Sequence, residues 1–152
     1  MNIDLHNHTK RCKHAIGESY EYVESAINCN IDIFGFACHA PMKFDEKYRM
    51  QFCEIDSYIK EIKDLRERYK DKIDIRVGFE VDYINQKEYL IEKKVLDSDV
   101  DYLVGSVHFL NNWGFDNEEF IGIYKNININ DAWIEYLESI SNMAQSGLFD
   151  IV

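Results

Sequence analysis

The sequence contains a single proline, Pro41, and only seven glycines among its 152 residues. Flexible linkers and low-complexity tracts depend on these residues, so we expect neither in this chain. Long apolar runs are also lacking, since none approaches the roughly 20 residues of a membrane-spanning helix. The first residues have neither the positive charge nor the apolar stretch of a signal peptide. These absences predict a cytoplasmic protein without a membrane partner.

Positive charge is scarce as well, because 17 Lys and Arg residues stand against 28 Asp and Glu residues, a net charge of −11. Phosphate backbones are bound by clusters of Lys and Arg, so this balance argues against a nucleic-acid partner. No glycine-rich phosphate loop and no Gly-x-Ser-x-Gly turn is present. Nucleotide-driven chemistry and a serine nucleophile of that type are therefore unsupported.

The four cysteines form no Cys-x-x-Cys pair, and a domain of this size is stable without disulfides. We expect free thiols in a reducing compartment. Cys38 falls in an apolar run and is interpreted as core packing, and Cys12 is interpreted as a neighbour of the first loop.

Hydrophobic residues make up 46% of the chain, enough for one domain with a sizeable core. Apolar periodicity predicts strands at 3–6, 33–38, 73–81, 102–108 and 148–152, and helices at 20–30, 53–69, 86–96 and 130–146. Ser19 is expected to cap the first helix and Asn130 the last, with Ile129 and Ile134 as a hydrophobic staple. The last helix is expected to end at Gly147.

Strands and helices alternate in this order, which is typical of an α/β fold with a parallel sheet covered by helices. A closed (β/α)₈ barrel takes about 250 residues. Five strands and four helices are a little over half of such a barrel. The pattern therefore indicates either an open α/β sheet or the leading part of a barrel.

Potential metal ligands follow the predicted strands at the point where each one ends. Because the carboxyl ends of parallel strands share one face of a sheet, we expect these side chains to lie close together. His14 lies in the first loop on that face and could join them. The strand-end residues are His6 and His8 after the first strand, His39 after the second, Glu80 in the third and His108 after the fourth.

Imidazole and carboxylate ligands suit Zn, Fe or Mn ions, and the set is too large for one tetrahedral ion, so two or three ions are predicted. Each ligand taken alone also has an ordinary structural explanation. His39 stands beside Pro41 and could be a hydrogen-bonded loop residue, and His108 could belong to the core. Glu80 could lie on the solvated face of an edge strand.

Four stretches in this order resemble the polymerase-and-histidinol-phosphatase (PHP) superfamily. The strings Glu-Val-Asp-Tyr, from Glu80, and Ser-Val-His-Phe-Leu, from Ser106, are similar to its histidinol-phosphate phosphatase branch. The stretches are residues 4–9 with 12–15, 36–41, 78–83 and 105–110.

The resemblance implies a distorted seven-stranded barrel with three metal ions at its carboxyl face. His6, His8 and Glu80 would hold one ion, Glu80 and His108 a second, and His39 would help to hold a third. His14 matches a position that serves either as a metal ligand or as a contact to the substrate phosphate. We favour the phosphate or leaving-group role for His14.

The implied activity is hydrolysis of L-histidinol phosphate to L-histidinol and phosphate, in histidine biosynthesis, by metal-bound hydroxide. The substrate is a small phosphate ester, and we expect His14 and Ser106 to contact it. Two alternatives stay open. One is a PHP phosphoesterase that acts on nucleotides or other small phosphate esters, and the other is a non-catalytic module that binds metal or a partner chain.

The family also places metal ligands after the fifth strand, and these do not occur before Val152. We therefore expect residues 1–152 to be the N-terminal part of a single PHP domain, about five strands of an incomplete barrel. Alone, this part is expected to show little phosphatase activity.

Overall fold

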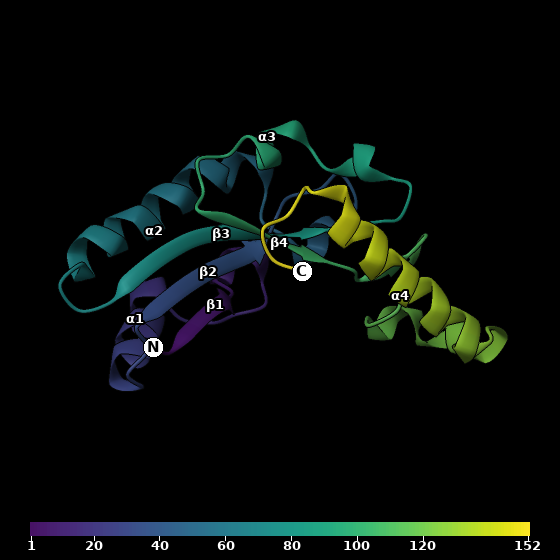
Figure 1. Cartoon of the computed structure of the whole chain (residues 1–152), viewed down its shortest axis with the longest axis horizontal. Helices are drawn as coiled ribbons and strands as arrows, with labels where there is room; N and C mark the ends of the chain where they lie inside the picture. The colour runs from purple at the N-terminus through teal and green to yellow at the C-terminus, as the bar shows by residue number, and fades with distance from the viewer.

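The computed structural model describes residues 1–152, with four parallel strands paired in chain order (Figure 1). After the last helix the chain returns to the sheet, where Ile151 forms a parallel bridge with Val104. The bridge lies in the predicted fifth strand. The sheet is curled like part of a barrel, so the predicted α/β fold is confirmed. The strands are β1 Ile3–Asn7, β2 Ile33–His39, β3 Asp74–Asp82 and β4 Tyr102–Ser106.

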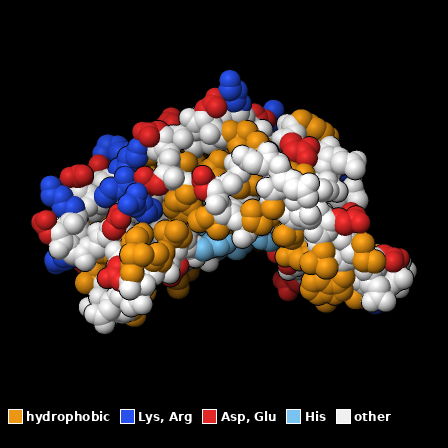
Figure 2. Space-filling view, viewed as in Figure 1, with side chains coloured by type: hydrophobic (Ala, Val, Ile, Leu, Met, Phe, Trp, Pro, Cys, Tyr) orange, Lys and Arg blue, Asp and Glu red, His pale blue; other side chains and the backbone are white.

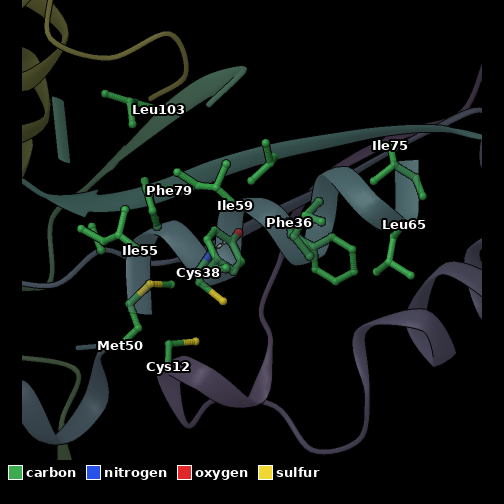
Figure 3. Packing of buried hydrophobic residues seen from close by; sticks show 14 of the residues in the cluster. Cys12, Phe36, Cys38, Met50, Ile55, Ile59, Leu65, Ile75, Phe79 and Leu103 are labelled. Carbon is green, nitrogen blue, oxygen red and sulfur yellow. Dashed lines mark hydrogen bonds between the residues drawn. The ribbon is translucent and has the colours of Figure 1, made fainter. Parts of the chain in front are cut away.

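Helices α1, Ser19–Asn28, and α2, Ile55–Tyr69, cover the convex face of the sheet. Phe36 of β2 and Phe79 of β3 are fully buried and belong to the same apolar cluster as Ile59 of α2 (Figure 3). The apolar side chains of β2 and β3 point toward these helices, because successive side chains of a strand point to opposite faces. The main core therefore lies between the sheet and these two helices.

Helix α4, Ile129–Ser146, lies at the other end of the molecule from α1 (Figure 1). The loop before it contains a small hairpin of β5, Phe109–Leu110, and β6, Trp113–Gly114, followed by a 3₁₀ segment over Glu118–Asn126. Leu110 and Met143 of α4 are buried in one small cluster. None of the helices combines the length and the apolar composition needed to cross a membrane.

On the concave face of the sheet, Tyr102 lies across the glycines of two neighbouring strands. A Cβ atom on Gly78 would lie 2.7 Å from the Tyr102 ring, and one on Gly35 would lie 2.3 Å from Tyr102 Oη. The Tyr102 hydroxyl donates a hydrogen bond to the carbonyl of Leu5 at 2.6 Å. Tyr102 thus ties β4 to β1 across the two glycine-bearing strands, and only a residue without a Cβ fits beneath it.

The polar half of β3 ends on this same concave face. Glu80 is 3% exposed and Asp82 is 0% exposed. The alternative that placed Glu80 on a solvated face is therefore wrong, because the curled sheet encloses the end of β3.

The start of α1 differs from the prediction. Its N-cap is Glu18, whose backbone N–H donates to the Glu21 carboxylate at 2.6 Å. Ser19 does not cap the helix, because Glu18 and Glu21 form a reciprocal capping box. The Ser19 hydroxyl donates instead to Glu61 of α2 at 2.5 Å. Ser19 therefore ties the two covering helices together.

Two other helices also differ from the prediction at their starts: α4 begins earlier than expected and α3, Lys93–Leu96, begins later. Asn128, not Asn130, caps α4, and its side chain accepts a hydrogen bond from the Asn130 N–H at 3.0 Å. Ile129 and Ile134 are 45% and 56% exposed, so the predicted staple is wrong. The helix expected over 86–96 is reduced to α3, because extended backbone at 91–92 interrupts it. The end of α4 at Gly147 is confirmed.

We predict that Gly78→Ala destabilises the chain by about 1–3 kcal/mol, because the new methyl group overpacks against Tyr102. Gly122→Ala is the matched control, since a Cβ there meets nothing within 4 Å. Urea unfolding followed by circular dichroism measures both. Equal midpoints for the two variants would show that the contact with Tyr102 imposes no constraint.

Candidate metal centre

The histidines predicted from the strand ends meet in a hollow on the concave side of the molecule, between its two halves (Figure 2). His6 lies in β1 and His8 directly after it, and His39 is the last residue of β2. His108 follows β4 by two residues. Parallel pairing with a regular register brings these ends to one edge, so His39 stands directly beside Glu80.

The Glu80 carboxylate is the centre of this group. Its Oε2 atom lies 3.2 Å from His6 Nε2 and 3.5 Å from His8 Nε2. The same oxygen lies 3.2 Å from His39 Nδ1, and Oε1 lies 3.5 Å from His108 Nε2. Glu80 Oε2 and His39 Nδ1 are buried without a hydrogen-bond partner. A buried polar atom without a partner is costly, so these atoms are arranged for a group that binds between them.

The protonation of the group follows from its burial and its charges. Burial lowers the pKa of His39 to about 4, so its imidazole is neutral at pH 7 and keeps a free lone pair. Burial alone would raise the pKa of Glu80, but the close approach of His6 and the charge of the neighbouring histidines lower it overall. The nearby Glu80 carboxylate in turn raises the pKa of His6. An ionised carboxylate and a neutral imidazole are the forms that bind a cation.

Two sets of three ligand atoms share Glu80, and within each set all atoms lie within 4.8 Å of one another. A carboxylate has two oxygens and can serve two ions at once. The nitrogen and oxygen donors match the preferences of divalent ions such as Zn. The residues therefore fit a divalent metal site built around Glu80. The sets are His6, His8 and Glu80, and His39, Glu80 and His108.

Asp82 and Arg49 support His108 from behind, and neither was predicted as a site residue. His108 Nδ1 donates to Asp82 Oδ1 at 2.8 Å, which leaves Nε2 facing Glu80. Asp82 Oδ2 pairs with the Arg49 guanidinium at 2.6 Å, and both residues are almost fully buried. A carboxylate behind a ligating histidine fixes the ring and its tautomer.

This pair also sets the charge on His108. Burial opposes the ionised form of Asp82, but the hydrogen bond from His108 and the Arg49 charge lower its pKa to about 2. Burial likewise opposes protonated His108, but Asp82 outweighs it and raises the pKa of His108 to about 9. A cation bound at Nε2 replaces that proton.

A cleft of about 400 Å³ opens beside the Glu80 group. His14 lies in its wall, with its ring centroid 4.6 Å from that of His39. His14 belongs to neither set of ligand atoms. The remaining wall includes Tyr48, Arg49, His108 and Asp116.

Ser106, predicted to contact substrate, lies at the end of β4 in register with Asp82. Its hydroxyl is buried and has no hydrogen-bond partner, and it does not line the cleft. Substrate contact by Ser106 stays a prediction. The other predicted site residues are brought together as expected.

A model of the PHP domain family matches residues 4–152. The chain belongs to this family. A Deinococcus radiodurans relative named "Probable histidinol-phosphatase" is 35% identical over 151 residues, which are 98% of this chain and 58% of the relative. The histidinol-phosphatase of Bacillus subtilis is 34% identical over 118 residues, covering 70% of this chain and 44% of that protein. The chain thus spans about half the length of these relatives.

Two solved structures share the fold of this chain. A Listeria monocytogenes protein superposes with a TM-score of 0.82 at 24% identity, over 97% of this chain and 62% of the other. A histidinol phosphate phosphatase of Lactococcus lactis, solved with zinc, L-histidinol and phosphate, gives a TM-score of 0.78 at 20% identity, over 96% of this chain and 54% of the other. The expected incomplete PHP barrel is confirmed.

We predict that Arg49→Ala destabilises the metal-free chain by about 3–5 kcal/mol, because it leaves the buried Asp82 charge unpaired. Lys60→Ala, which breaks an exposed ion pair with Asp64, is the control and should cost less than about 1 kcal/mol. Denaturant midpoints measure both. A similar small loss for the two variants would contradict the assigned role of the buried pair.

Proposed function

We propose that this chain carries part of the metal centre of a phosphomonoesterase that hydrolyses L-histidinol phosphate to L-histidinol and phosphate. The observation that carries the proposal is the buried Glu80 carboxylate with four histidine nitrogens within 3.5 Å, beside a cleft large enough for a small ester. The names of the relatives support the substrate. Since the chain spans 58% of the first of them, both activity and substrate remain proposals.

The proposed centre holds two or three ions of Zn, Fe or Mn. His6, His8 and Glu80 would hold one, and Glu80 with His108 a second. His39 would serve the second ion or help to hold a third. Such ions supply positive charge for the phosphoryl oxygens and generate a nucleophile from water at neutral pH. Zinc in the Lactococcus lactis structure supports this choice of metals.

The chain's own residues would orient the ester and handle its proton. His14 stands at the cleft wall outside both ligand sets, which supports a role in contacting the phosphate or protonating the leaving alcohol. Arg49 lines the same cleft but is already paired with Asp82, so we assign it to positioning His108. Ser106 is proposed as a further substrate contact. The free thiols of all four cysteines support a reducing, cytoplasmic setting.

The test uses a form of the protein extended to the full length of its relatives. We predict the highest kcat/KM for L-histidinol phosphate in a panel with a nucleoside monophosphate and p-nitrophenyl phosphate. His14→Ala should lower kcat by about 10²-fold or more while metal content is unchanged, because a general acid contributes at least that much. Lys10→Ala, a nearby loop residue paired with Glu18 outside the cleft, is the control.

A preference for the nucleotide would assign the protein to the PHP phosphoesterases of other substrates. Absence of turnover by folded, metal-loaded protein would make it a binding module. Equal loss of metal and of kcat in His14→Ala would make His14 a ligand.

A further inference from the structure

A second group of potential metal ligands, Cys12 and Cys38, lies behind His8, on the other side of the sheet from Glu80. Cys12 and Cys38 are both 0% exposed, and they lie close together beside Met50 although they come from separate elements (Figure 3). Cys38 precedes His39 in β2, so the two side chains point to opposite faces of the strand. The thiols are therefore separated from the carboxylate centre by the sheet itself.

His8 connects the two groups through its two ring nitrogens. Its Nε2 atom faces Glu80 at 3.5 Å, and its Nδ1 atom lies 3.3 Å from the Cys12 sulfur. One ring nitrogen of His8 and the two sulfurs all lie within 4.8 Å of one another. Ligands bound at about 2.0–2.3 Å to one tetrahedral ion stand roughly 3.5 Å apart, so the three atoms need to move little to share an ion.

Local structure fixes the positions of these donors. Thr9 caps the short 3₁₀ turn Lys10–Cys12, which returns Cys12 to the side of His8. The backbone N–H of Thr9 lies 3.0 Å from Cys38 Sγ, and the Thr9 hydroxyl lies 3.0 Å from the same atom. Burial raises the pKa of the Cys38 thiol well above its usual range, and the two contacts with Thr9 act in the opposite direction. A bound metal ion takes the place of the thiol proton.

We propose that His8, Cys12 and Cys38 form a binding site for one thiophilic metal ion, of the class of Zn²⁺, Cd²⁺ or Cu⁺, distinct from the Glu80 centre. Two thiolates and an imidazole select soft or borderline ions, whereas carboxylate and imidazole ligands do not require softness. A neutral imidazole has one lone pair. An ion at the thiol site therefore removes His8 from the Glu80 centre, and the two sites compete. The competition rests on the proposed metal centre, but the binding does not.

The test is a titration of the metal-free, reduced chain with Cd²⁺, followed by the ultraviolet charge-transfer absorption of a thiolate–cadmium bond. We expect a band that saturates, with a final intensity corresponding to one thiolate-bound Cd²⁺ ion per chain. Cys12→Ser and Cys38→Ser should each abolish it. The matched control is the double variant Cys29→Ser/Cys53→Ser, which removes the two exposed thiols and should keep the band.

Two further variants separate this site from the first and guard against misfolding. Glu80→Gln should keep the band, because it alters only the carboxylate centre. Thr9→Val removes the hydroxyl near Cys38 and should weaken Cd²⁺ binding by about 10–100-fold, the range for groups that support a ligand. His8→Ala changes a partly exposed ring, leaves both thiols intact, and should also weaken binding. Circular dichroism checks the fold of each.

The proposal is overturned if the folded wild-type chain shows no band. It is also overturned if the band is lost in Cys29→Ser/Cys53→Ser or persists in folded Cys12→Ser. None of these outcomes depends on phosphatase turnover, so failure of this site and failure of the proposed function are distinguished.

Discussion

One buried carboxylate organises the carboxyl end of this sheet. Glu80 is 3% exposed, and an ionised group in that position is stable only with compensating partners. The four histidines at the ends of β1, β2 and β4 supply them, so the partners come from three different strands. Their convergence depends on the parallel register, which places His39 beside Glu80. The sheet, the ligand set and the charge balance are therefore parts of one constraint.

The strands and their order could be predicted from the sequence, because burial on two faces gives apolar runs or strict alternation. Ile33–His39 and Asp74–Asp82 lie within a residue or two of the expected ranges. Helix starts were predicted less well, since several polar side chains compete to cap the same turn. Glu18 prevails over Ser19 because Ser19 finds a partner in Glu61, which belongs to a helix distant in sequence.

The site likewise combines residues that a local sequence pattern predicts with residues that only the folded chain brings together. Its candidate ligands lie at strand ends, so the predicted strands and the residue types at their ends were sufficient to find them. Asp82 could have been inferred, because it follows Glu80 by two residues and so shares its face. Arg49 gave no comparable signal: it comes from the loop after β2 and reaches Asp82 only through the fold. The proximity of Cys12 to Cys38 likewise arises from packing of the first loop against the convex face of β2.

The central claim is that Glu80 and its histidines bind metal. A crystal structure of the zinc-loaded chain, with anomalous data collected at the zinc edge, tests it most directly. The account predicts at least one zinc peak about 2.0–2.2 Å from a Glu80 oxygen and from histidine nitrogens of either ligand set. A folded, zinc-saturated chain with no peak at Glu80, and with Glu80 still paired only to its histidines, would contradict it.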